Sequence, residues 1–203
     1  METIIRHPYS ERIAKVIRVL TVPPLMAAIL VWILHIVRPE SFMKPGGSGL
    51  MLLFLTVLPA LAYPLSAVIP YIRKAGRNGQ RNLAFILSGI GYVCGFLYGL
   101  CGPCSRTELM IYGIYLISVI LLTFFNKGLH IKASGHACSV TGPLVLSSWL
   151  LGGAGITAGL ALSAAIVWSS LKLKRHTLKE LTLGALLCLT AAALSYIFTY
   201  KLL

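Results

Sequence analysis

The 203-residue chain contains no aspartate, and glutamate supplies all five of its acidic side chains. Sites for Mg²⁺, Ca²⁺ or a pair of catalytic metal ions are built mainly from carboxylates. This shortage argues against carboxylate-bound metal catalysis, and no metal or other cofactor is expected. Charged residues of both signs are also scarce, at 11% of the chain. Because so few residues are charged, the chain is not expected to contain a soluble domain of any size in addition to its apolar segments.

Apolar residues make up 57% of the chain, and its mean hydropathy is +0.84. A helix needs roughly 17–25 apolar residues to cross a hydrocarbon layer about 30 Å thick. The candidate spans are residues 19–37, 50–72, 83–100, 109–125, 137–151, 156–171 and 178–198. The sequence therefore predicts an all-α integral membrane protein with about seven, or six to seven, transmembrane helices in one bundle. We expect a single domain over residues 1–203, with residues 1–18 as a short interfacial segment.

The basic residues are distributed unevenly over the predicted loops. With seven spans, 14 of the 18 Lys and Arg residues lie on the face of the N-terminus and four on the other face. The positive-inside rule places the basic face, and the N-terminus with it, in the cytoplasm. These cations suit membrane lipids and an anionic lipid headgroup as partners. Nucleic acid is not an expected partner, because the basic residues lie between the predicted membrane spans and do not form a solvated domain. The oligomeric state stays open.

Three segments bring unusual polar residues to this basic face. In the first, Lys74 and Arg81 are seven residues apart, which is two turns if the stretch is helical and returns both cations to one stripe. In the second, Ser134 is a plausible N-cap of the helix that follows. Free N–H groups at a helix start form an anion site, and Gly135 lets a ligand approach them.

The third segment leads into the last predicted helix. His176 and Glu180 are spaced i and i+4, so the carboxylate can accept the imidazole N–H and hold the other ring nitrogen ready for chemistry.

Taken in order, these segments resemble the three signatures of the type 2 phosphatidic acid phosphatase superfamily, the membrane lipid phosphatases related to vanadium haloperoxidases. The family pattern reads roughly K-x6-R-P, then P-S-G-H, then S-R-x5-H-x3-D. The resemblance covers Lys74 to Glu180, about half of the chain. It implies metal-independent hydrolysis of a phosphomonoester or diphosphate of a membrane lipid through a phosphohistidine intermediate.

The resemblance also implies a role for each matching residue. His176 would attack phosphorus while Glu180 orients it. His136 would protonate the leaving lipid alkoxide and then activate water. Phosphate binding would fall to a set of cations and backbone amides, namely Lys74, Arg81, Ser134 and Gly135.

The chain departs from the family pattern at four positions. Asn82 and Ala133 stand where the pattern has proline, and Glu180 where it has aspartate. At the fourth, Ser170 occupies the place of a phosphate-binding arginine, and a hydroxyl cannot supply a charged bidentate fork. We expect Lys174, one turn later if the stretch is helical, to substitute in part as a phosphate-binding point charge.

Two other functions compete with the phosphatase. Cys101 and Cys104 form a C-x-x-C motif in a predicted outer loop, the spacing of thiol-disulfide oxidoreductases, and are a possible redox pair. A non-catalytic lipid-phosphate-binding or transport protein would use the same cations. The sequence does not choose among phosphatidate, phosphatidylglycerophosphate and polyprenyl phosphate as the ligand, because the predicted spans are anonymous Leu, Ala and Val.

Overall fold

The computed structural model describes residues 8–203, apart from the side chains of Pro8 and Leu150, and this part of the chain contains helices and no strand. Proline stands at the start of α2 and again at the start of α6, where its fixed φ suits the first helical turn. The elements in chain order are α1 (Pro8–Leu20), α2 (Pro23–Val37), the 3₁₀ helix η1 (Pro39–Ser41), α3 (Gly47–Leu52), the π-helix η2 (Leu53–Val57), α4 (Leu58–Ala60), α5 (Ala62–Val68), α6 (Pro70–Lys74), α7 (Gly76–Cys101), α8 (Arg106–Thr123), the π-helix η3 (Phe124–Gly128), α9 (Gly135–Leu151), α10 (Gly153–Lys172), α11 (Leu178–Ile197) and the π-helix η4 (Phe198–Leu202).

Five helical segments of the described chain are long and apolar enough to cross a membrane. They are Gly47–Val68, Gly76–Cys101, Arg106–Gly128, Gly153–Lys172 and Leu178–Leu202. A sixth candidate is the pair α1 and α2, which meet at an angle of 61° and could form one broken span. The all-helical, multi-pass character predicted from the sequence is confirmed, whereas the count of about seven spans is not. Helix α9 has 17 residues, which correspond to about 26 Å of helix and fall short of the hydrocarbon thickness.

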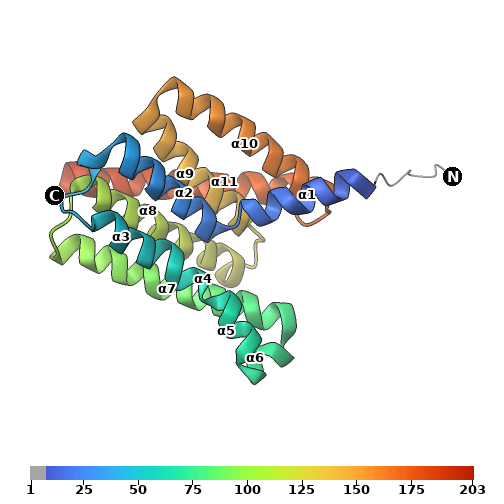
Figure 1. Cartoon of the computed structure of the whole chain (residues 1–203). Coiled ribbons are helices and arrows are strands. Elements are labelled where there is room, and N and C mark those ends of the chain that lie inside the picture. Colours follow the sequence, from blue (N-terminus) through green and yellow to red (C-terminus); the bar gives the residue numbers. More distant parts are fainter. Residues whose placement is uncertain (1–7) are drawn as a thin grey trace.

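The helices follow one another across the bundle in an order that differs from the chain order (Figure 1). Helix α10 packs on α9, α9 on α11, α11 on α8, and α8 on α7, while the rod formed by α3 to α5 covers α7. Helix α2 lies across α9, and α1 packs on α10. Of the predicted interfacial segment, residues 1–7 lie outside the described residues, and α1 forms the rest.

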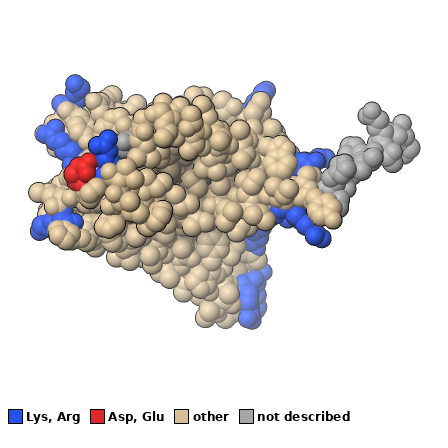
Figure 2. All heavy atoms as spheres, turned by 45° about the horizontal axis from the view of Figure 1, so that its top comes forward, with Lys and Arg blue, Asp and Glu red and all other residues tan. Residues whose placement is uncertain are grey.

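The connections divide between two ends of the bundle. The C-terminus and η1 lie at one end, while α1, the start of α7, the η3–α9 connection and the α10–α11 connection lie toward the other (Figure 1). On the face seen in Figure 2, Lys and Arg side chains gather toward the two ends, and the belt between them carries few charged side chains. The three segments singled out in the sequence therefore share one end of the molecule.

Helix α11 approaches the start of α9 very closely. Gly184 lies against the backbone of Ser134, where a Cβ atom would collide with the carbonyl oxygen. One turn earlier, the backbone carbonyl of Glu180 accepts a hydrogen bond of 2.9 Å from the Ser134 N–H. This contact fixes the first turn of α9 beside the first turn of α11, and each of these turns carries a residue of the predicted site.

Candidate active site

His176 and Glu180 form a hydrogen-bonded pair at the start of α11. Thr177 is the N-cap of this helix and accepts a hydrogen bond from the Glu180 N–H at 3.3 Å. His176 directly precedes the cap, and its Nδ1 lies 2.7 Å from Oε2 of Glu180. The carboxylate thus accepts the Nδ1 proton and leaves the lone pair on Nε2. The i, i+4 hydrogen bond predicted from the sequence is confirmed.

The second oxygen of Glu180 is bound by a lysine from another segment. Nζ of Lys132 lies 3.1 Å from Oε1 of Glu180. Lys132 belongs to the loop between η3 and α9, and the side-chain oxygen of Asn126 accepts the Ala133 N–H at 3.0 Å and anchors this loop to the preceding helix. Both carboxylate oxygens are therefore engaged, which restricts rotation of the Glu180 side chain and of the imidazole that it holds.

His136 lies in the first turn of α9. Its Nε2 is 2.8 Å from Oγ1 of Thr21, a residue that directly follows α1. The Thr21 hydroxyl is also 2.7 Å from the carbonyl oxygen of Ile17 and can donate its single proton there. Thr21 then accepts from Nε2, an arrangement that favours the neutral imidazole with its proton on Nε2.

Burial and neighbouring cations keep both histidines neutral. Burial lowers the pKa of His136 to about 4, with further repulsion from Arg18 and His176. Burial also lowers the pKa of His176, and Arg18 and Lys132 act in the same direction, while the Glu180 carboxylate opposes them. These mutual effects mean that the two imidazoles and the Arg18 guanidinium lie within electrostatic reach of one another. We call this group the histidine cluster, and it consists of Arg18, Thr21, Lys132, His136, His176 and Glu180.

Arg18 enters the cluster from the last turns of α1. Its Nη1 donates a hydrogen bond of 3.0 Å to Oγ of Ser170, a residue with no exposed surface near the end of α10. Arg175 and Arg77 lie close enough to repel the Arg18 charge. Among the described residues the half-buried guanidinium forms no ion pair. The surplus of positive charge at this end of the bundle suits an anionic ligand.

The start of α9 differs in part from the expectation. Ser134 is the N-cap, as predicted, and its hydroxyl accepts from the Ala137 N–H at 3.2 Å. Its own N–H, however, donates to the carbonyl of Glu180, so the predicted role of this amide as an anion donor does not hold. The N–H groups of Gly135 and His136 have no hydrogen-bond partner within residues 8–203, and they remain the donors that an anion could use.

Lys74 and Arg81 do not share one helical stripe. Helix α6 ends at Lys74, and Gly76 has φ of 59°, which breaks the helix before α7 begins. Both side chains are exposed and form no hydrogen bond or ion pair with the described residues. The α7 cation whose charge acts on Arg18 is instead Arg77. Participation of Lys74 and Arg81 in phosphate binding stays a prediction that these contacts do not support.

Lys174 does not take the place expected of it. The helix ends at Lys172, and Lys174 lies in the following turn with φ of 50° and an exposed side chain. The stretch is not helical at this residue, so the premise of a cation one turn after Ser170 is wrong. The cation that contacts Ser170 comes from α1 and is Arg18.

Sequence reasoning missed Arg18, Thr21 and Lys132 as members of the cluster. Arg18 and Thr21 are three residues apart and immediately precede the Pro23-Pro24 start of α2. This spacing places them on one face of a helix end, which is a signal that the sequence offered. Lys132 lies two residues before the predicted N-cap. It gave no signal beyond its charge, because its partner Glu180 is 48 positions away.

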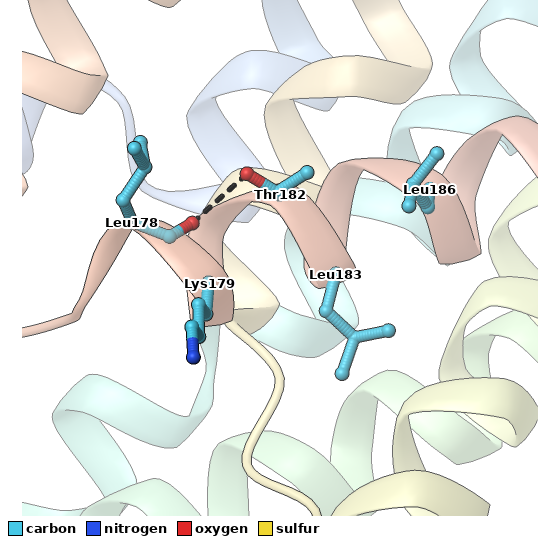
Figure 3. A pocket seen from close by; sticks show the side chains of 5 residues that line it. All are labelled: Leu178, Lys179, Thr182, Leu183 and Leu186. Carbon is cyan, nitrogen blue, oxygen red and sulfur yellow. Dashed lines mark hydrogen bonds between the residues drawn. The ribbon is translucent and has the colours of Figure 1, made fainter.

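An apolar groove begins beside the histidine cluster. It has a volume of about 230 Å³ and opens between α9, α10 and α11. Ala137, Leu178 and Leu181 line its near end, one residue or two from His136, His176 and Glu180. Val167 lines it from α10. A second depression on the surface of α11 shares Leu178 and Thr182 with this groove and is completed by Lys179, Leu183 and Leu186 of the same helix. The Thr182 hydroxyl donates a hydrogen bond to the Leu178 carbonyl (Figure 3).

The C-x-x-C cysteines lie at the opposite end of the bundle. Cys101 ends α7, Cys104 precedes α8, and both are free thiols. Burial, together with the nearby Glu108 carboxylate, raises the pKa of Cys104 to about 12. A thiol with a raised pKa is a poor nucleophile, so this environment does not favour thiol-disulfide exchange.

Comparison of the chain with models of known protein families, with curated proteins and with solved structures finds no match. Within residues 8–203, no group of three or more His, Cys, Asp or Glu side chains is placed to hold a metal ion. The function is therefore inferred from the chemistry of the histidine cluster itself.

Proposed function

We propose that this protein is a metal-independent lipid phosphate phosphatase, which hydrolyses a phosphomonoester or diphosphate of a membrane lipid. The observation that carries the proposal is the His176–Glu180 pair, with Nδ1 and Oε2 2.7 Å apart, among cations at the end of the bundle. A carboxylate that holds Nδ1–H keeps Nε2 unprotonated and aimed, which is the requirement for a nucleophilic imidazole.

In the first step, Nε2 of His176 attacks phosphorus. The N–P bond forms while the bond between phosphorus and the lipid oxygen breaks, and the electron pair of that bond leaves with the oxygen. Positive charge developing on the imidazole is stabilised by Glu180, which retains its hydrogen bond to Nδ1–H. The leaving alkoxide takes a proton from Nε2 of the His136 imidazolium, which becomes the neutral imidazole; in the structure this Nε2 lies 2.8 Å from the Thr21 hydroxyl oxygen.

Burial lowers the pKa of His136 to about 4, so this imidazole is neutral at pH 7 before substrate binds. A phosphate dianion would offset the repulsion from Arg18 and raise this pKa toward the operating pH. In the second step, neutral His136 accepts a proton from water as the water oxygen attacks phosphorus. The N–P bond breaks, inorganic phosphate leaves, and the nucleophile is regenerated. Substrate binding thus supplies the protonation state that each step requires.

The apolar groove supports a lipid as the substrate. A molecule with its phosphate between His136 and His176 has its hydrophobic portion at the groove mouth, beside Leu178 and Leu181. A groove of about 230 Å³ accommodates part of one acyl or prenyl chain, and the open sides between the helices lead to the surrounding hydrocarbon. A water-soluble phosphate ester would gain nothing from this groove.

The proposal is tested by measuring phosphate release from a panel of lipid phosphates by the purified full chain in detergent with EDTA. His176→Asn should reduce the rate by at least about 10²-fold, because the nucleophile is lost. His130→Asn is the matched control: His130 is exposed in the η3–α9 loop with φ of 56°, which asparagine tolerates. Full activity in His176→Asn contradicts the proposal, and lipid-phosphate binding without turnover in the wild type favours the non-catalytic alternative.

The lipid specificity is tested with Val167→Trp, which fills the groove. We expect kcat/KM to fall about tenfold for a long-chain lipid phosphate and to stay unchanged for a short-chain, water-soluble phosphomonoester. Leu183→Trp, in the depression of Figure 3, is the control, because Leu183 does not line the groove. Equal losses for both substrates would contradict a role of the groove in lipid binding.

We place the cluster on the cytoplasmic side of the membrane, on the basis of the 14-to-four distribution of Lys and Arg. The test is accessibility of Arg77→Cys in a variant whose exposed native cysteines have been replaced. Labelling by a membrane-impermeant thiol reagent is expected in broken cells alone. Labelling from outside intact cells would reverse this orientation.

A further inference from the structure

We propose that Arg18 of α1 is a phosphate-binding cation of the site and occupies the space beside Ser170, which stands in place of an arginine. This inference rests on the proposed function for the identity of the anion. In this account the cation beside the histidines is supplied by α1, through Arg18, and not by α10, where the family pattern has its arginine.

The contacts of Ser170 locate this position. Ser170 has no exposed surface, and its Oγ accepts Nη1 of Arg18 at 3.0 Å. Its carbonyl accepts the Arg175 N–H at 3.0 Å, so the chain folds back and brings the residue before His176 onto Ser170. An arginine side chain from position 170 and one from position 18 would therefore meet in the same space beside His176.

The electrostatic surroundings suit the binding of an anion rather than a structural ion pair. Arg18 acts on both His136 and His176, and its charged neighbours Arg77 and Arg175 are both cations. Its side-chain contact with a described residue is the neutral hydroxyl of Ser170. This one bond uses a single N–H of a guanidinium that carries five, so a planar donor fork is left for a phosphoryl group.

A purely structural role is the competing explanation. Helix α1 packs on α10, and the bond from Arg18 to Ser170 could serve as a tether between them. A tether requires a hydrogen-bond donor on one helix and an acceptor on the other, which the exchanged pair, Arg18→Ser with Ser170→Arg, would also supply, whereas an anion site requires a cation. Arg18→Gln keeps a donor at position 18 and removes the charge, so it separates these requirements. A loss of anion affinity as large as in Arg18→Met supports the anion site, and wild-type affinity in Arg18→Gln overturns it.

The test uses orthovanadate, a phosphate analogue, and the full chain in detergent. Vanadate affinity is measured by calorimetry for the wild type, Arg18→Met, Arg18→Gln, the double variant Arg18→Ser with Ser170→Arg, and Arg12→Met. We expect Arg18→Met to weaken binding by about 10–100-fold, the usual contribution of a charged hydrogen bond. The double variant should recover most of this loss. Arg12 is exposed on the same helix, so Arg12→Met should bind as the wild type does.

The outcomes for Arg18 and for catalysis are distinguishable, because vanadate binding does not require turnover. Loss in Arg18→Met with recovery in the double variant supports the inference even if no lipid phosphate is hydrolysed. Unchanged affinity in a folded Arg18→Met, absence of recovery in the double variant, or absence of vanadate binding in the wild type overturns it. If Arg18→Met does not fold, Arg18→Lys provides the comparison: it keeps the charge and loses the fork, and unchanged affinity in Arg18→Lys overturns the fork assignment.

Discussion

Two helices of this protein begin with the same local signature and use it differently. Helix α8 has Ser105 as N-cap and Glu108 three residues later, and helix α11 has Thr177 and Glu180 in the same positions. At α8 the Glu108 carboxylate turns back and accepts the Ser105 N–H at 2.8 Å, which closes a capping box. At α11 the Thr177 hydroxyl accepts the Glu180 N–H, which is one of the two capping-box hydrogen bonds. The Glu180 carboxylate does not form the other and instead contacts His176 and Lys132.

The surroundings explain the difference. Glu108 has 1% of its surface exposed and also accepts the Met43 N–H at 3.0 Å, so both of its partners are backbone groups that cannot change charge. Glu180 contacts an imidazole, whose protonation can change within a reaction. A carboxylate committed to backbone amides stabilises a helix end, whereas one committed to a titratable side chain is available for chemistry.

The largest effect expected from breaking this comparison is on catalysis at α11. Glu180→Gln should lower kcat by about 10²–10⁴-fold with little loss of folding, because the amide no longer stabilises the charged imidazole. Phosphate release measured beside a thermal unfolding curve checks this. A folded Glu180→Gln variant with wild-type kcat would contradict the assignment of Glu180 as the orienting residue.

The second prediction concerns pH. His136 has a pKa of about 4 in the folded protein and an ordinary value of 6.5, so the folded state disfavours its protonation. The stability from neutral His136 is therefore complete above pH 6.5 and is lost as the pH falls toward 4. The loss amounts to at most about 3 kcal/mol, at about 1.4 kcal/mol per pKa unit.

The midpoint temperature of thermal unfolding in detergent should thus decrease as the pH is lowered from 6.5 to 4. In His136→Gln the midpoint temperature should depend less on pH. An identical pH dependence in wild type and His136→Gln would show that another group is responsible.

Glu108→Gln tests the structural half of the comparison. Both N–H groups donate to Oε2, so the amide oxygen can accept both bonds but without the negative charge that strengthens them, and the free energy of unfolding should fall by about 1–3 kcal/mol. The kcat of the folded molecules should stay unchanged, because Glu108 lies at the end of the bundle opposite the histidine cluster. Chemical denaturation and an active-fraction-corrected assay provide the two readouts.

The smallest expected effect is that of Lys132→Met. The Lys132 side chain is 65% exposed, and ion pairs of this kind contribute at most about 1 kcal/mol. We expect kcat to fall less than about fivefold, far less than in Glu180→Gln. A loss as large as that of Glu180→Gln would assign Lys132 a direct role at the phosphoryl group.

The sequence predicted those features that depend on local periodicity. The helical segments are confirmed, and so are the Ser134 N-cap and the hydrogen bond between His176 and Glu180. The N-cap and the hydrogen bond each involve residues at the start of a single helix. The number of spans could not be predicted to the same accuracy, because α1 and α2 meet at 61° and α9 is short.

Contacts between distant segments were beyond sequence reasoning. Arg18 reaches Ser170 across 152 positions, and Thr21 reaches His136 across 115. Lys74 and Arg81 looked like a pair on a continuous helix, but the left-handed φ of Gly76 interrupts it. Lys174 failed as a substitute cation for a similar reason, since α10 ends before it.

The most direct test of the central claim is to trap the covalent intermediate. The full chain is incubated with a lipid phosphate labelled at phosphorus, in EDTA, and quenched in base, in which phosphohistidine survives. The account predicts acid-labile label on the peptide that contains His176, and no such label in His176→Asn. Phosphate release with no label on His176 would contradict it.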